Sequence, residues 1–96
     1  MALPKFLQPY LASYELSKMD VRGDKEIIIT QILNRGDFEA LIWLGKNYSK
    51  DEIEKVVAKP IRGMWLANTL TYWVKILDVK LPQKVKKEAI INLNPR

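Results

Sequence analysis

Apolar residues recur at helical spacing through most of this chain, and glycine, proline or a capping residue marks each interruption. Residues 24–36 begin with a candidate N-cap, Asp24, and one stripe of this segment carries Ile28, Ile29, Ile32 and Leu33. Gly36 ends the segment, where the sequence predicts a residue in the left-handed conformation. Three consecutive isoleucines would also suit a strand, but the acidic first turn and the terminal glycine favour a helix.

A second helix is predicted over residues 37–48, because the Asp37 side chain can accept from the first free N–H groups of a helix that follows it. Helical spacing places Trp43 on the solvent side with Glu39 and Lys46. The expected buried face holds Phe38, Leu41, Ile42, Leu44 and Tyr48.

Further helices are predicted in the second half of the chain. Ser49 and Glu52 have the spacing of a capping box, and Pro60 stops the helix that they begin, whose buried stripe is Ile53, Val56 and Val57. A helix over residues 63–77 should be apolar on most of its surface, with one polar stripe formed by Asn68, Thr71 and Lys75. Pro82 is expected to begin a last helix over residues 82–93.

The first 20 residues contain Pro4 and Pro9 among apolar anchors without a sustained helical period, which predicts an arm that packs onto the body. The expected fold class is therefore all-α: a single compact bundle of four or five short helices with an N-terminal arm. A helix-turn-helix-like arrangement at residues 49–77 is one form that this bundle can take. We expect one domain over residues 1–96, divided into the arm (1–20), a helical core (24–80) and a basic C-terminal segment (81–96).

The amino-acid composition excludes several kinds of functional site. Among 96 residues there is neither cysteine nor histidine, which excludes disulfides, thiolate metal sites and the usual general base at neutral pH, so we expect no metal and no cofactor. No apolar run is long enough to span a membrane and prolines interrupt the N-terminus, so a cytoplasmic protein without a membrane partner is expected. The net charge of the chain is +5, and its basic character belongs to residues 59–96, which hold eight Lys/Arg against two Asp/Glu.

Catalysis would have to depend on carboxylates, either Asp37 with Glu39 or the acidic cluster at residues 51–54, assisted by Tyr48 or Lys55. Asp37 and Glu52 stand at predicted helix starts, where acids satisfy free N–H groups, and the other acids fall on solvent faces. A structural role explains these residues better than an active site, and a non-enzymatic protein is expected.

Two kinds of binding remain open. In a DNA-binding helix-turn-helix, residues 49–59 would support a recognition helix at 63–77 across the turn 60–62. The groove-facing side chains would be Arg62, Asn68, Thr71 and Lys75, and the phosphate contacts would come from Lys80, Lys84, Lys86 and Lys87. In a protein-binding module, surplus aromatic surface would anchor a partner or a second copy of the chain, and the candidate anchors are Trp43, Trp65 and Tyr72. The alternative is that the N-terminal arm or the C-terminal segment covers these side chains.

The core run GDFEALIWLGKNYSKDEI, residues 36–53, and the later Asn68 and Trp73 carry a resemblance to a family. The chain resembles an uncharacterised family of small helical prokaryotic proteins with a G-D-[LF]-E-A-[LI]-x-W-L core and a Y-[GS]-K-[DE]-E-I helix start. Members of that family are typically encoded beside nucleotidyltransferase-type toxins of the abortive-infection class. The resemblance implies an antitoxin-like or accessory role, with such a toxin as the protein partner.

Overall fold

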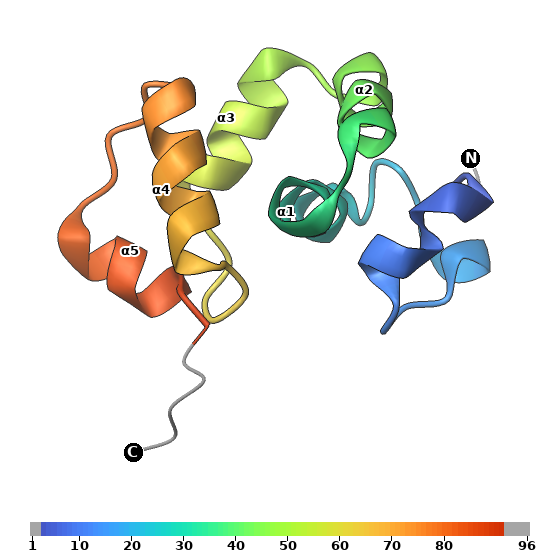
Figure 1. The fold of residues 1–96 in the computed structure, drawn as a ribbon, viewed down its shortest axis with the longest axis horizontal. Coiled ribbons are helices and arrows are strands. Elements are labelled where there is room, and N and C mark those ends of the chain that lie inside the picture. Colours follow the sequence, from blue (N-terminus) through green and yellow to red (C-terminus); the bar gives the residue numbers. More distant parts are fainter. Residues whose placement is uncertain (1–2, 92–96) are drawn as a thin grey trace.

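The computed structural model describes residues 3–91 and is all-α over that range, which confirms the predicted fold class (Figure 1). Two short 3-10 helices, η1 (Lys5–Leu11) and η2 (Leu16–Lys18), form the arm. Five α-helices follow: α1 (Lys25–Arg35), α2 (Phe38–Asn47), α3 (Lys50–Ala58), α4 (Ala67–Ile76) and α5 (Gln83–Ala89).

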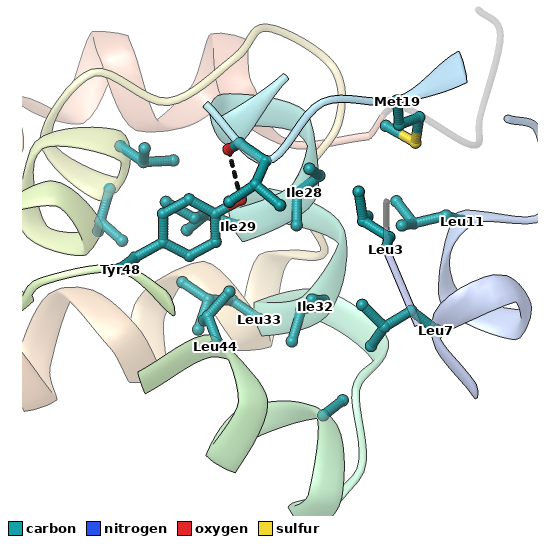
Figure 2. Packing of buried hydrophobic residues seen from close by; sticks show 14 of the residues in the cluster. Leu3, Leu7, Leu11, Met19, Ile28, Ile29, Ile32, Leu33, Leu44 and Tyr48 are labelled. Atoms are coloured by element: carbon teal, nitrogen blue, oxygen red, sulfur yellow. Dashed lines mark hydrogen bonds between the residues drawn. The ribbon is translucent and has the colours of Figure 1, made fainter. Parts of the chain in front are cut away.

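Helix α1 lies at the centre of the fold and packs against η1, α2, α3 and α4. Its stripe of apolar residues is buried as expected, and Ile28, Ile29 and Ile32 are fully inaccessible to solvent. Figure 2 shows these isoleucines between the leucines of the arm and the side chains of Leu44 and Tyr48. The arm therefore completes one side of the core, because Leu7 and Leu11 are also fully buried.

Gly36 joins α1 to α2 in a different way from the one that the sequence predicted. The prediction of a left-handed residue is wrong, since Gly36 has φ −68° and ψ 146°. Glycine is required here by a close approach: a Cβ would stand 2.6 Å from the carbonyl oxygen of Ile32 and 3.0 Å from the Cβ of Ala40. The tight corner brings α2 directly back onto α1.

The predicted caps of α2 and α3 are confirmed. Asp37 Oδ1 accepts from the N–H of Ala40 at 2.9 Å, and Ser49 and Glu52 form a complete reciprocal capping box at the start of α3. Helix α3 ends at Ala58, two residues before Pro60, as the sequence predicted.

Helix α4 begins at Ala67, so the prediction of a helix from residue 63 is wrong for its first turn. The preceding residues are held in an extended course instead. Trp65 forms a parallel bridge with Ile90, and the Asn34 side chain donates to the carbonyl of Met64 at 2.8 Å and accepts from the N–H of Leu66 at 3.2 Å. Hydrogen bonds between segments far apart in sequence outweigh the local helical spacing here.

The last helix is shorter than predicted. Pro82 is the N-cap of α5. The helix ends at Ala89 because the chain beyond it runs beside Trp65, and the main-chain N–H of Trp65 donates to the carbonyl of Ala89 at 2.9 Å. The remainder of the predicted helix, at residues 92–93, and the end of the basic segment lie outside the described residues.

Candidate protein-binding surface

Helix α2 carries far more apolar surface than its packing uses. Its sequence, FEALIWLGKN, has three polar residues, Glu39, Lys46 and Asn47. A helix that is apolar on nearly every side is normally surrounded by protein. The main contact of α2 among the described elements, however, is with α1 alone, and in Figure 1 it stands apart from α3 and α4.

The inner face of α2 consists of Ala40 and Leu44, both buried against the core. The opposite side presents residues spaced i, i+3, i+4 and i+7, which share one face of a helix. We call these four residues the outer stripe: Phe38, Leu41, Ile42 and Gly45. Phe38 is 76% exposed and Ile42 is 41% exposed, so the prediction that both belong to the buried face is wrong. Because α2 packs mainly against α1, one face suffices for most of its packing.

Trp43, the first predicted anchor, is half-buried rather than directed fully at solvent, and it packs against the edge of the core. Its ring meets that of Tyr48 edge-on, with 6.0 Å between centroids. With Phe6 of the arm and Ile42, it also lines a shallow hollow of about 240 Å³. Trp43 therefore contributes one apolar edge to a surface that continues onto Phe6, which is 42% exposed.

The other two predicted anchors have opposite environments. Trp65 is fully buried, so the expectation that it lies at an accessible helix edge is wrong; its place in the extended segment beside Ile90 turns it into the core. Tyr72 on α4 is 57% exposed, and its ring stacks edge-on against Trp73 with 5.1 Å between centroids. Tyr72 remains available to a partner.

An apolar groove lies between α2 on one side and α3 and α4 on the other. Its volume is about 310 Å³, and its principal lining residues are Leu33, Leu41, Gly45, Ile53, Trp73 and Leu77. The indole N–H of Trp73 donates to the carbonyl of Leu33 at 3.2 Å, which fixes the ring in the wall and satisfies a carbonyl at the C-terminal end of α1. Leu41 and Gly45 belong to both the groove and the outer stripe.

The proposed DNA-contacting residues are mostly exposed. Asn68, Thr71 and Lys75 share the outer face of α4, although the Thr71 hydroxyl donates to the carbonyl of Ala67 at 3.0 Å. Arg62 lies in the connection before α4, Lys80 in the connection after it, and α5 carries Lys84, Lys86 and Lys87, of which Lys86 is half-buried. The connection between α3 and α4 covers residues 59–66, so the expected three-residue turn at 60–62 is wrong.

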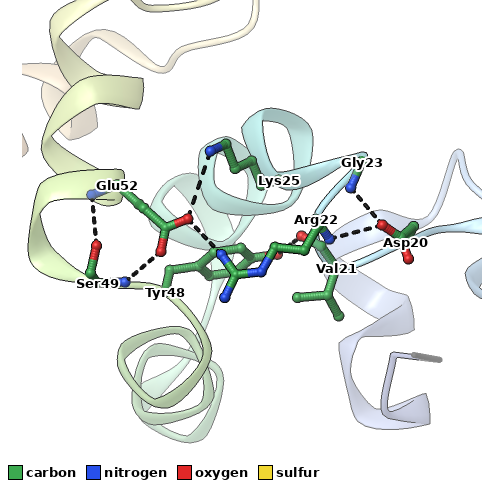
Figure 3. A network of polar contacts seen from close by, with 8 residues as sticks. All are labelled: Asp20, Val21, Arg22, Gly23, Lys25, Tyr48, Ser49 and Glu52. Atoms are coloured by element: carbon green, nitrogen blue, oxygen red, sulfur yellow. Dashed lines mark hydrogen bonds and ion pairs between the residues drawn. The ribbon is translucent and has the colours of Figure 1, made fainter.

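A polar network joins the start of α3 to the segment before α1 (Figure 3). Glu52 Oε2 pairs with Arg22 at 2.6 Å and with Lys25 at 3.7 Å, while Oε1 accepts from the N–H of Ser49. The Arg22 guanidinium lies 5.9 Å from the centre of the Tyr48 ring. Glu52 is thus fully engaged in holding two segments together.

The pKa values of Glu52 and Tyr48 in this network depart from their ordinary range. The hydrogen bond from the Ser49 N–H, with Arg22 and Lys25 nearby, lowers the pKa of Glu52 against an opposing effect of desolvation. Burial raises the pKa of Tyr48 to about 12, and its phenol donates to the carbonyl of Val21 at 2.8 Å. Both groups are held in their ordinary protonation states at neutral pH, which suits structural roles.

Within residues 3–91, no acidic side chains cluster in a group of three that could hold a metal ion. None of the helices in that range combines the length and apolar character that a bilayer crossing requires.

These features define a small helical protein with uncovered apolar surface on α2 and an adjoining groove. The chain belongs to the family of unknown function DUF6922, which matches residues 10–57, half of its length. The match confirms the expectation of an uncharacterised family, and it covers α1, α2 and most of α3. No curated protein and no solved structure matches the chain.

Sequence reasoning missed the outer stripe, because it assigned the exposed Phe38 and Ile42 to the core. The sequence does contain one indication of an accessible face, which is Gly45 inside a helix whose other residues are mostly apolar. Periodicity alone could not use this signal, since an almost wholly apolar helix has no unique buried face.

Proposed function

We propose that this chain is a non-enzymatic helical interaction protein that binds another protein through the outer stripe of α2. The observation that carries the proposal is the exposure of Phe38 and Ile42, four residues apart on a helix that packs mainly against α1. Contiguous apolar surface on a small protein is typical of a binding site.

The surroundings of the outer stripe also favour a protein partner. Trp43 extends the apolar surface beyond the outer stripe and Phe6 carries it onto the arm, and aromatic side chains are enriched at the energetic centres of interfaces. Glu39 and Lys46 line the same hollow and would supply a polar rim. Such a surface can contact a protein over several side chains, whereas it offers little to a phosphate backbone.

More specifically, we propose that the partner is a nucleotidyltransferase-type toxin and that this chain is its antitoxin or an accessory protein. The support for this proposal is the sequence resemblance over residues 36–53, which include the whole of α2. The absence of histidine and cysteine from the sequence and the engagement of Asp37 and Glu52 in helix caps favour binding over catalysis.

Co-expression with a nucleotidyltransferase encoded beside the gene tests the proposal. We expect the two proteins to purify as one complex, and the double substitution Phe38→Ser/Ile42→Ser should remove it. Both residues are exposed, so the variant should keep its helical circular dichroism. Trp43→Ala should also weaken the complex, but its effect includes lost packing because Trp43 is half-buried.

Tyr72→Ser is the matched control, since it removes a large exposed side chain from a different helix. Independent elution of the two unmutated proteins would contradict the toxin as partner. A complex that survives Phe38→Ser/Ile42→Ser and is lost with Tyr72→Ser would move the interface to α4. Dimers of the protein alone in light scattering, abolished by Phe38→Ser/Ile42→Ser, would favour a self-associating module instead.

A further inference from the structure

The groove beside α2 contains a glycine that the fold does not require. Gly45 is the eighth of ten residues in α2, it has no positive φ, and, apart from its chain neighbours and the backbone of its own helix, no described atom lies within 4 Å of the place where its Cβ would stand. Glycine inside a helix destabilises it relative to alanine. The absence of a side chain at this position leaves open the part of α2 that faces the groove.

A glycine at this position would allow another molecule to approach the backbone of α2 closely. The surrounding wall is apolar, with Leu41 before Gly45 on α2, and with Trp73 on α4 and Leu77 directly after α4 across the groove. A helix that lays apolar side chains into such a groove is a recurring mode of recognition, and a glycine in the wall lets the two helices come closer together. The volume of about 310 Å³ has room for a few aliphatic side chains.

The charge at the groove indicates which helix fits. Lys50 is the only charged residue among the described residues that line it. Lys50 is the first residue of α3, where a cation is unfavourable for the helix dipole. Its exposed ammonium lies 3.7 Å from the partly buried Glu54 carboxylate, in the weaker Lys-before-Glu order. A carboxylate from an incoming helix would pair with Lys50 more favourably.

The net charge disfavours a second copy of the chain as the occupant. Two molecules of charge +5 repel each other, whereas an acidic partner is attracted. We infer that the groove between α2 and the α3–α4 pair binds one amphipathic helix of a partner protein, with its apolar side over Gly45 and an acidic residue beside Lys50. This inference rests on the proposed protein-binding function and assigns it a partner chemistry.

A labelled peptide of about 15 residues serves as the probe, with leucine at positions i, i+3, i+4 and i+7 and glutamate at most others. Fluorescence anisotropy should detect saturable binding to the full chain. A peptide with the same composition in scrambled order should bind at least about tenfold more weakly, and so should the peptide in which lysine replaces every glutamate.

Two substitutions at Gly45 separate binding from stability. Gly45→Leu should fill the groove and weaken peptide binding by about tenfold or more. Gly45→Ala should weaken binding less, while it raises the midpoint of thermal unfolding because alanine is the better helix former. A loss of binding together with a gain in stability is an outcome that general damage to the fold cannot produce.

Lys50→Glu tests the charge, and Lys84→Glu on α5 is its matched control. Each places an acid in the first turn of a helix and changes the net charge equally, but Lys84 does not line the groove. We expect Lys50→Glu to weaken binding of the acidic peptide severalfold more than Lys84→Glu does. Equal effects would show attraction to net charge alone and would overturn the inference.

Absence of binding by the acidic peptide, or binding that Gly45→Leu leaves unchanged, would also overturn the inference. Concentration-dependent dimers abolished by Gly45→Leu would assign the groove to a second copy and reject the acidic helix. A complex with the toxin that is lost with Phe38→Ser/Ile42→Ser but unaffected by Gly45→Leu would reject the groove and leave the proposed function intact.

Discussion

The phenol of Tyr48 donates a 2.8 Å hydrogen bond to the main-chain carbonyl of Val21, 27 residues earlier in the chain. The two residues are buried, and the bond joins the C-terminal end of α2 to the segment that leads into α1 (Figure 3). The groove and the outer stripe are both built on α2, so this bond helps to fix the helix that carries the candidate site.

Tyr48→Phe should therefore destabilise the fold by about 1 kcal/mol, because the ring is kept while the carbonyl of Val21 loses its donor in a buried place.

The wild type should also lose stability as pH rises from about 10 towards 12, since the unfolded phenol ionises near 10 and the folded one only at about 12. Urea unfolding at pH 7 and above pH 10 measures both effects. Tyr72→Phe, at an exposed position, should not reproduce the loss of stability at pH 7, and an alkaline slope as steep in Tyr48→Phe as in the wild type would contradict the assignment.

Glu52→Gln should reduce the loss of stability in acid. The pKa of Glu52 is lowered in the folded state, so at mildly acidic pH the unfolded chain binds more protons than the folded chain. Its stabilising contribution is present above the unfolded pKa and disappears as pH falls through the lower folded pKa. Glutamine keeps the capping-box geometry, which isolates the effect of charge.

Thermal midpoints measured from pH 7 down to pH 3 check this prediction. The wild-type curve should fall more steeply than that of Glu52→Gln, while Glu88→Gln on α5 serves as a control with the same change in charge at an exposed site. Parallel curves for the wild type and Glu52→Gln would mean that the carboxylate charge does not stabilise the folded protein through the Ser49 N–H bond or through the contacts with Arg22 and Lys25.

Gly36→Ala should destabilise the fold by roughly 1–3 kcal/mol, because the added methyl group would meet the carbonyl oxygen of Ile32 at 2.6 Å and force α1 and α2 apart. The usual gain of alanine over glycine in the unfolded chain is too small to compensate. Urea unfolding measures the change. Gly45→Ala provides the opposite case, since open space surrounds that position, and equal effects at the two glycines would contradict the corner geometry.

Trp65→Ala should destabilise the fold by about 3–5 kcal/mol, because it removes the largest fully buried side chain and leaves a cavity in the core. Tyr72→Ala should change stability by much less, since that ring is more than half exposed. Chemical unfolding of both variants checks the difference. A similar loss in both would contradict the core position of Trp65 and return it to the candidates for partner binding.

Local chemistry explains which features could be predicted. The caps at Asp37 and Ser49 involve groups three residues apart, so the sequence contains both partners of each hydrogen bond. The start of α4 could not be predicted in this way. It depends on Asn34 and Ile90, which hold the backbone around Trp65 from distant parts of the chain.

The candidate site was predictable only in outline. The excess of aromatic residues predicted that Trp43, Trp65 and Tyr72 would be accessible to a partner. Tyr72 is exposed and Trp43 has an accessible edge, but Trp65 is buried in the core. Periodicity placed Phe38 and Ile42 inside because most helices have a single apolar face. Helix α2 has two, and the number of neighbours that cover it is a property of the tertiary structure.

The helix-turn-helix alternative leads to a last prediction: a DNA duplex should form no complex that resists moderate salt. The connection over residues 59–66 is longer than the turn of that motif, and the exposed face of α4 that carries Lys75 also carries the apolar Tyr72 and Ile76. Any binding should then be to phosphates alone and should be lost between about 50 and 200 mM salt in a gel-shift experiment.

Arg62→Ala and Lys75→Ala should weaken this DNA binding no more than Lys5→Ala in the arm, which removes the same charge. A sequence-dependent complex that survives 200 mM salt and is weakened selectively by Lys75→Ala would instead make α4 a recognition helix, and the outer stripe of α2 would then need a separate explanation.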